Sequence, residues 1–422
     1  MRWVANLGRL VVAGWLAMGL GGCATESVGE IPPVAVSDAA EDWGQVATVP
    51  SGRPDHRVWV QDRVLQHSLL FDGDTGEMLG AVDTASGVGA RPVYAAQGRG
   101  EVYSIETYYS RGLRGARTDQ VVVYDAKDLA VQAEIEIPPT AADTGQGIAL
   151  GAVLDGERFF VALNQSPGSS VSIIDLEERR LVTEIVTGGC SMVYAVGPQR
   201  FGMLCGDGTA LLVELDAQGN EVRTTSSDTF FDVVADPVTV SGVRDGTTWS
   251  FASFDGMLHQ IDFSGEKPVA RKPWSLFTEA ERKAEWKVGG FQHLALHWAS
   301  GRLYSVVHQT DKTGTHKDPG LAIWVYDSKT HERVMEIEAP NVLIPFVRPF
   351  LEIEKDSFAV RVLGYLLPPP GVHTIAVTQD DAPLLFARNV DLGAVGVLDA
   401  MSGEHLRDLE QVGLSGATLV VP

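Results

Sequence analysis

The sequence predicts an all-β protein, a seven-bladed β-propeller in which seven small antiparallel sheets close into one ring. Seven times along the chain, an apolar or β-branched run ends in an aspartate, a polar turn follows, and a second β-rich run resumes. Successive aspartates lie 41 to 72 residues apart, and a period of about 40–50 residues is typical of arrays of small sheets. The seven aspartates are Asp72, Asp125, Asp175, Asp216, Asp262, Asp327 and Asp399.

Each repeat predicts two antiparallel strands joined by a tight turn. An aspartate carboxylate at the point of chain reversal can accept hydrogen bonds from the backbone N–H groups of the turn. A single blade cannot bury its faces, whereas seven blades can close into one ring. The chain has 422 residues, with 45 glycines and 21 prolines that fit its many turns, and we expect one large domain over residues 56–422.

The N-terminus has the layout of an export signal. Arg2 and Arg9 lie in a short start, and the apolar stretch over residues 10–20 is too short to span a membrane. The Leu-Gly-Gly-Cys sequence that ends at Cys23 resembles a bacterial lipobox, in which the cysteine is lipidated. We therefore expect a lipoprotein signal peptide over residues 1–22 and a lipid anchor on Cys23 in the periplasm. The alternative is an ordinary cleaved signal followed by a chance cysteine.

The next segment and the overall charge limit the kinds of partner. Residues 23–55 contain prolines, small residues and acids without strand periodicity, which predicts a flexible tether. The formal net charge is −22 and the sequence pI is about 4.8, which argues against nucleic acid and against anionic lipid surfaces. Contact with a membrane is therefore expected only through the lipid anchor.

The first elements of the domain are a strand and a basic loop. Residues 56–62 alternate as a strand does and could close the ring by completing the last blade. Arg111, Arg114 and Arg117 follow at a spacing of three, between two strand-like runs of this acidic chain. They are candidate contact residues for an acidic partner surface. A solvated hairpin tip is the equally simple alternative.

Cys190 and Cys205 are the two cysteines of the expected domain. Export implies an oxidising compartment, so an even pair of cysteines predicts a disulfide. A redox-active pair is normally separated by two residues at the start of a helix, and this pair is not. We therefore predict a structural bridge.

The second half of the chain contains two departures from the β pattern. Thr278 followed by Glu281 forms a capping box at the start of a short helix, and two glycines at 289 and 290 stop it. Residues 340–371 lengthen the gap to the last repeat, and we expect them to hold an extra apolar strand pair that three prolines end.

Known catalytic and metal-binding motifs are largely missing from the sequence. The run from Asp72 to Gly76 resembles the start of a calcium loop, but its glycine comes one position early, and a hairpin turn explains it better. His293 and His297 would share one face of a strand, but without a third ligand they are interpreted as packed or rim histidines. We expect no catalytic, cofactor-binding or metal-binding residue in this chain.

Several segments together resemble the heavy subunit of quinoprotein amine dehydrogenases, of the methylamine and aromatic amine type. The most specific is FTEAERKAEWKVGGFQ, and RVWVQD, SRGLRGARTDQVVVYD, MLCGDG, LHQIDFSGE, YDSKTHERVMEIE and VTQDDAPLLFA extend the resemblance. Trp286 and Phe291 of the first segment are further candidate contact residues for a partner. The resemblance implies that Cys190 and Cys205 match the disulfide pair of the family.

The resemblance also implies a function for the chain. Heavy subunits of this family are seven-bladed propellers without a redox centre, and they pair as two heavy and two light chains in the periplasm. The small light chain carries tryptophan tryptophylquinone, oxidises a primary amine to an aldehyde and ammonia, and passes electrons to a blue copper protein. The alternative for this chain is a stand-alone propeller lipoprotein that acts as a binding or assembly module without enzyme activity.

Overall fold

The computed structural model describes residues 48–85, 91–142, 147–351, 353–354 and 357–422. The compact unit that contains them spans Ala47–Pro422. The predicted signal peptide, Cys23 and most of the predicted tether therefore lie outside the described residues. Within the described part, no helix is long and apolar enough to cross a membrane.

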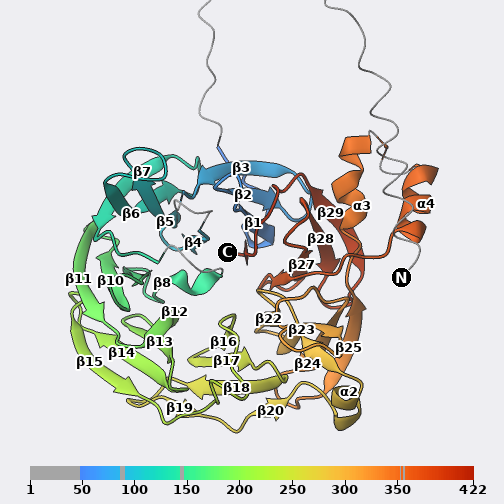
Figure 1. Cartoon of the computed structure of the whole chain (residues 1–422). Helices are drawn as coiled ribbons and strands as arrows, with labels where there is room; N and C mark the ends of the chain where they lie inside the picture. The colour runs from blue at the N-terminus through green and yellow to red at the C-terminus, as the bar shows by residue number, and fades with distance from the viewer. Residues whose placement is uncertain (1–47, 86–90, 143–146, 352, 355–356) are drawn as a thin grey trace, which may run out of the picture. The chain divides into compact units, whose positions relative to one another are not determined.

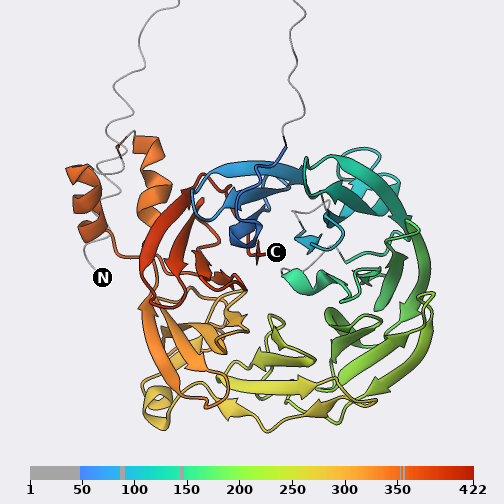
Figure 2. The ribbon, with the colours of Figure 1, turned by 180° about the vertical axis from the view of Figure 1, so that it is seen from behind.

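Seven antiparallel sheets are arranged as a ring, which confirms the predicted seven-bladed β-propeller (Figure 1; Figure 2 shows the ring from behind). The first blade holds β1 (Arg57–Asp62), β2 (His67–Asp72), β3 (Met78–Asp83) and β30 (Leu419–Val420); the second β4 (Val93–Ala96), β5 (Glu101–Tyr109), β6 (Arg117–Asp125) and β7 (Val131–Ile137); the third β8 (Gly151–Val153), β9 (Phe159–Asn164), β10 (Ser170–Asp175) and β11 (Arg180–Val186).

The fourth blade holds β12 (Cys190–Gly197), β13 (Arg200–Cys205), β14 (Ala210–Leu215) and β15 (Glu221–Ser226); the fifth β16 (Val243–Asp245), β17 (Thr248–Ala252), β18 (Met257–Asp262), β19 (Val269–Ala270) and β20 (Trp274–Ser275); the sixth β21 (Trp286–Val288), β22 (Leu294–His297), β23 (Arg302–Gln309), β24 (Ala322–Asp327) and β25 (Arg333–Glu338); the seventh β26 (Thr374–Val377), β27 (Leu384–Arg388), β28 (Ala394–Asp399) and β29 (His405–Glu410). Short helical turns are η1 (Pro54–His56) and η2 (Ile148–Leu150).

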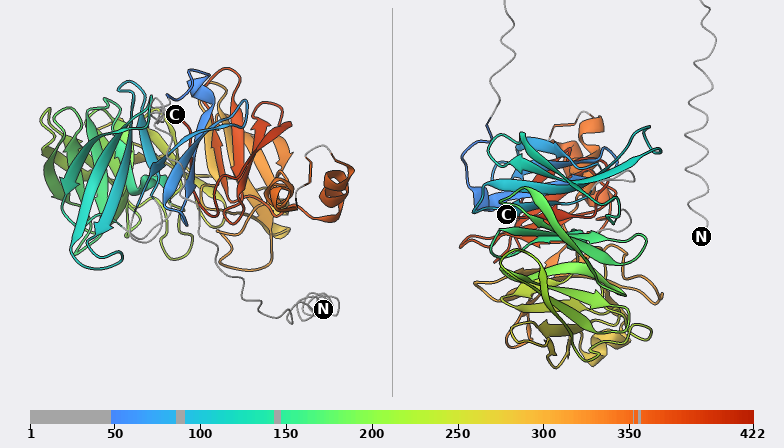
Figure 3. Two further views of the ribbon diagram at one scale, coloured as in Figure 1. Left: turned by 90° about the horizontal axis from the view of Figure 1, so that it is seen from above. Right: turned by 90° about the vertical axis from the view of Figure 1, so that its left-hand side faces the viewer.

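The seven repeat aspartates have the predicted role. Each accepts a hydrogen bond from the backbone N–H two residues further along, at 2.7–2.9 Å, in the turn between the third and fourth strands of its blade. Asp72 also accepts from Thr75, so the calcium-like run is a hairpin turn. Strand direction alternates along a blade, so all seven aspartate turns lie on one face of the ring, which we call the aspartate face. Figure 3 shows the ring edge-on.

The opposite face carries the connections between the second and third strands of each blade, and we call it the hairpin face. The core lies between neighbouring blades. The strand β10 is buried at every position, whereas the outermost strand β15 is mostly exposed. Inner strands are covered on both faces by adjacent blades, which favours the continuous apolar runs seen in the sequence.

The ring closes through the C-terminus. The strand β30 pairs with β1, in the register Trp59 to Val420 and Val60 to Leu419. The prediction that residues 56–62 complete the last blade is therefore wrong: β1 belongs to the blade of Asp72, and the C-terminal strand completes that blade. The two assignments are hard to separate in sequence, because either terminus can supply the closing strand of a propeller.

The predicted short helix is present, but the prediction that the glycines at 289 and 290 stop it is wrong. The helix ends at Lys283, because the chain turns at Glu285, which has a positive φ, and enters β21 before those glycines. The helix α2 (Glu279–Lys283) starts at Thr278, whose side chain accepts from the N–H of Glu281 while the Glu281 carboxylate accepts from the N–H of Thr278. The predicted strand pair in residues 340–371 is wrong. The segment forms α3 (Leu343–Val347), η3 (Pro349–Leu351) and α4 (Phe358–Leu366). A short apolar run does not by itself distinguish strand from helix, and the missed signal was Ser357, which caps α4.

Candidate partner-binding face

The arginine loop lies at the tip of the hairpin between β5 and β6. Arg111 and Arg114 are exposed, and the N–H of Arg111 donates to the carbonyl of Arg114 at 2.9 Å. Between them Leu113 is 78% exposed. The tip therefore presents one apolar side chain between two cations, which suits a protein surface with acidic groups around an apolar patch.

Arg117 has a different environment from the other two arginines. Its guanidinium donates to both carboxylate oxygens of Asp119, at 2.8 and 2.9 Å, and to the carbonyl of Ala141 at 2.7 Å. Asp119 is fully buried and also accepts from the Thr107 hydroxyl at 2.9 Å. Arg117 therefore fixes the base of the hairpin, and the structure brings only Arg111 and Arg114 together at the tip.

A buried carboxyl lies in the same hairpin, which the sequence did not reveal. Glu106 accepts from the hydroxyls of Tyr124, at 2.8 Å, and Tyr108. Burial raises the pKa of Glu106 to about 7, against the opposing effect of those two hydrogen bonds. Tyr124 also donates to the carbonyl of Asp83 at 2.9 Å. This network stiffens the hairpin beneath the exposed arginines.

Trp286 and Phe291 lie in the sixth blade, near the same face as the arginine loop. Trp286 is half-buried and packs on Trp324 with ring centroids 4.6 Å apart. Phe291 is half-buried, its N–H donates to the carbonyl of His373 at 2.7 Å, and Lys317 lies 5.9 Å from its ring centroid. Trp286 pairs with Gln309 at the end of β23, and Phe291 lies shortly before β22. The chain is close to the hairpin face at both positions.

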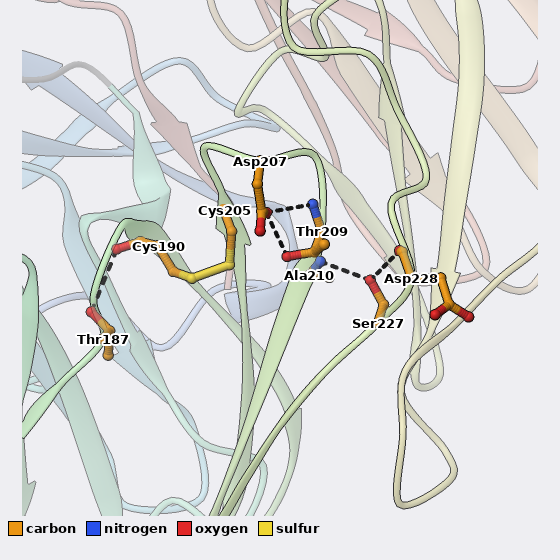
Figure 4. Close-up of a disulfide and its surroundings, with 8 residues drawn as sticks. All are labelled: Thr187, Cys190, Cys205, Asp207, Thr209, Ala210, Ser227 and Asp228. Atoms are coloured by element: carbon orange, nitrogen blue, oxygen red, sulfur yellow. Dashed lines mark hydrogen bonds between the residues drawn. A yellow bond between two sulfur atoms is a disulfide. The ribbon is translucent and has the colours of Figure 1, made fainter.

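The predicted disulfide is present (Figure 4). Cys190 and Cys205 face each other directly across β12 and β13, and the Thr187 hydroxyl donates to the carbonyl of Cys190 at 3.4 Å. The adjoining turn is closed by Asp207, whose carboxylate accepts from the N–H of Thr209 at 3.0 Å. The turn after Cys205 joins the second and third strands, so the bridge also lies at the hairpin face.

The two histidines singled out in the sequence are packed side chains. His293 is fully buried and its Nε2 lies 3.1 Å from the Thr239 hydroxyl; burial lowers its pKa to about 4. His297 contacts Ser300 at 2.8 Å and the carbonyl of Asp380 at 3.0 Å. Over the described ranges, no group of three or more histidine, cysteine or carboxylate side chains could hold a metal ion.

The cavities at the centre of the ring have a mostly apolar lining. Two adjoining cavities of about 250 Å³ each share Trp249, Ile148 and the C-terminal residues Val420 and Val421 among their lining. Trp249 donates to the carbonyl of Ala195 at 3.0 Å, so its ring is held in place. These cavities therefore offer a rigid apolar lining that the C-terminus partly fills.

The fold defines a seven-bladed propeller with one disulfide inside its fourth blade, and the exposed arginine loop is a candidate binding surface on its hairpin face. Its residues 55–343 match the family model described as methylamine dehydrogenase heavy chain (MADH). The chain belongs to the methylamine dehydrogenase heavy chain family.

Curated relatives agree with this assignment. The methylamine dehydrogenase heavy chain of Paracoccus versutus is 28% identical over 371 residues, which cover 85% of this chain and 78% of that protein. The heavy chain of Methylorubrum extorquens is 26% identical over 421 residues, which cover 97% of this chain and 93% of that protein. The predicted family is thus confirmed.

Solved structures support the fold alone. The dihydro-heme d1 dehydrogenase NirN matches with a TM-score of 0.51 at 19% identity, over 87% of this chain and 75% of that chain. A functionally unknown protein from Desulfotomaculum acetoxidans matches with a TM-score of 0.51 at 11% identity, over 87% of this chain and 98% of that chain.

Proposed function

We propose that this chain is the non-catalytic heavy subunit of an amine dehydrogenase that uses tryptophan tryptophylquinone. The family match over residues 55–343 carries the proposal. The quinone, held by a small light chain, would take up the electrons when a primary amine is oxidised to an aldehyde and ammonia. A blue copper protein is the proposed next electron acceptor.

The role proposed for this chain is to hold and orient the light chain. Support comes from the hairpin face, where Arg111 and Arg114 are exposed on a hairpin whose base is fixed by the Arg117–Asp119 ion pair. A preorganised surface of this kind loses little conformational entropy on binding. Two heavy and two light chains are the proposed assembly.

Co-purification tests the proposal. An affinity-tagged heavy chain, purified from its own host out of both periplasm and solubilised membranes, should bring down a small subunit that stains for quinone. The preparation should oxidise methylamine or an aromatic amine with a dye as electron acceptor. A homogeneous preparation of the single chain that does not stain for quinone would contradict the enzyme assignment. The alternative, a stand-alone binding module, would then be favoured.

We propose further that the protein is periplasmic and anchored through a lipid on Cys23. Support comes from the Leu-Gly-Gly-Cys sequence that follows the apolar stretch. The variant Cys23→Ser should move from the membrane fraction to the soluble fraction. The matched variant Cys190→Ser should stay in the membrane fraction. Unchanged fractionation of Cys23→Ser would contradict the anchor.

A further inference from the structure

The helical elements α3, η3 and α4, which we call the apolar arm, lie outside the ring, and α3 packs beside β29 (Figure 1). The match to the family model ends at residue 343, where the arm begins. Arg348 pairs with Glu410 on β29, and the Asn341 side-chain amide donates to the carbonyl of Leu367 at 3.0 Å, which ties the two ends of the arm together. The arm is therefore a fixed projection of the seventh blade.

The arm exposes large apolar side chains. Phe350 is 73% and Phe358 is 80% exposed, and they are the only exposed phenylalanines among the described residues. On α4, Phe358, Val362 and Leu366 recur every four residues, so they form a stripe along one side of the helix. The apolar arm thus leaves an apolar helix face without a partner in the described chain.

The size of this face favours a lipid surface over a stable protein interface. A nine-residue helix is about 14 Å long and about 10 Å wide, so the exposed side of α4 and the exposed Phe350 of η3 add up to on the order of 300 Å². A stable protein complex buries about 800 Å² on each partner. A short helix with phenylalanine and leucine on one face can instead insert into the boundary between lipid headgroups and acyl chains.

The chain that precedes the described part can reach the same membrane. Residues 24–47 lie between the proposed lipid on Cys23 and the first described residue, and so many residues span up to about 80 Å when extended. With the lipid on Cys23 that we propose above, the protein would stay near the bilayer, and attachment at one end of the chain does not fix the orientation of the ring. A second contact on the ring itself would set the orientation.

We propose that the apolar arm inserts into the membrane surface through Phe350, Leu351, Phe358, Val362 and Leu366. Insertion there turns the wall of the seventh blade toward the bilayer. The net charge of −22 opposes approach to anionic lipid, so the arm binds zwitterionic lipid and anionic lipid weakens the binding. This surface lies apart from the arginine loop, which stays free for a protein partner.

Vesicle co-sedimentation tests the proposal on the full exported chain that carries Cys23→Ser and therefore lacks the lipid. This chain should sediment with phosphatidylcholine vesicles, and less so when phosphatidylglycerol is added at low salt. Phe350→Ser with Phe358→Ser should weaken binding at least about tenfold, since burying one phenylalanine is worth roughly a factor of ten. The matched variant, Val186→Ser with Val234→Ser, removes two exposed aliphatic side chains elsewhere on the ring and should bind as before.

Three outcomes would overturn the proposal. The first is no binding to either kind of vesicle, and the second is binding that the two phenylalanine substitutions leave unchanged while thermal unfolding shows a folded chain. The third is a protein interface at the same place: a dimer seen in sedimentation velocity, or a complex with the light chain, that dissociates when the same two phenylalanines are replaced. A second probe, Phe358→Trp, should be quenched by bromine-labelled lipid. These measurements use the heavy chain alone, so their failure is distinct from failure of the quinone assignment.

Discussion

Trp59 and Val420 are direct partners in one antiparallel sheet, although they lie near opposite ends of the ring-forming chain. Their pairing joins the first blade to the C-terminus and closes the propeller. Leu419 and Val420 are 1% and 7% exposed, so the closing strand buries both side chains. The last few residues therefore support the whole ring.

Removing residues 419–422 should open this closure. Two buried aliphatic side chains account for about 3–6 kcal/mol of the free energy of unfolding, and the loss should be measured by urea unfolding. Limited proteolysis should then cut the chain near residues 57–62. Deletion of Pro422 alone is the control. A truncated chain as stable as the full one would show that β30 does not hold the ring.

The disulfide should stabilise the fourth blade. The bridge closes a loop with a sequence separation of 15 residues, and the chain-entropy model gives about 3 kcal/mol for such a loop. Replacing both Cys190 and Cys205 by alanine should lower the free energy of unfolding in urea by that amount under oxidising conditions. Under reducing conditions the difference between the two proteins should shrink, and a persistent difference would point to packing instead.

The stability of an aspartate turn should depend on the acceptor oxygen of the aspartate side chain and not on its negative charge. The Asp399 carboxylate accepts from the N–H of Met401 at 2.9 Å and of Ser402 at 2.7 Å. Asp399→Ala should cost about 1–2 kcal/mol of unfolding free energy. Asp399→Asn keeps an acceptor oxygen and should retain most of the stability in the same denaturation assay. Equal losses for both variants would assign the effect to charge.

Burial of His293 should make the protein less stable in acid. Its pKa is lowered to about 4 in the folded state, by burial, from an ordinary value of 6.5. Between these values the unfolded chain binds the proton and the folded chain does not, so the contribution of His293 to stability falls as pH drops from about 6.5 to about 4, by up to about 3 kcal/mol. The raised pKa of Glu106 acts in the opposite direction between about 4.5 and 7, so the effect of His293 is read from its variant.

The variant His293→Gln should flatten this part of the curve of unfolding free energy against pH. The exposed His331 provides the matched substitution, His331→Gln, which should leave the slope as it is in the unmodified protein. If both variants keep the full slope, other groups titrate in this range and His293 does not contribute.

The exposed arginines should govern association with the proposed light chain. Arg111→Glu with Arg114→Glu should weaken binding about tenfold at low salt, mainly through slower association, and less at high salt because surface charges are screened. Binding kinetics at several salt concentrations measure this. Arg180→Glu, an exposed arginine in another blade, is the control. If the association kinetics are unchanged, the arginine loop is a solvated hairpin tip and not a partner contact.

Much of the fold could be predicted from local patterns. The seven aspartates mark their turns because an aspartate that accepts the N–H two residues on is a local interaction. The capping box of Thr278 and Glu281 is local for the same reason. The helices of residues 340–371 were not predicted, because a short apolar run is compatible with a strand or a helix, and its tertiary contacts decide between them.

The sequence by itself determined the seven blades, the short helix α2, the Cys190–Cys205 pair and the family. Only the tertiary structure decided which terminus closes the ring, that Arg117 pairs with Asp119 while Arg111 and Arg114 stay exposed, and that Glu106 and His293 are buried. The physical reason is the range of the interactions. Turns and caps form between residues a few positions apart, whereas burial, ring closure and the exposed side of the apolar arm depend on residues that only the folded ring brings together.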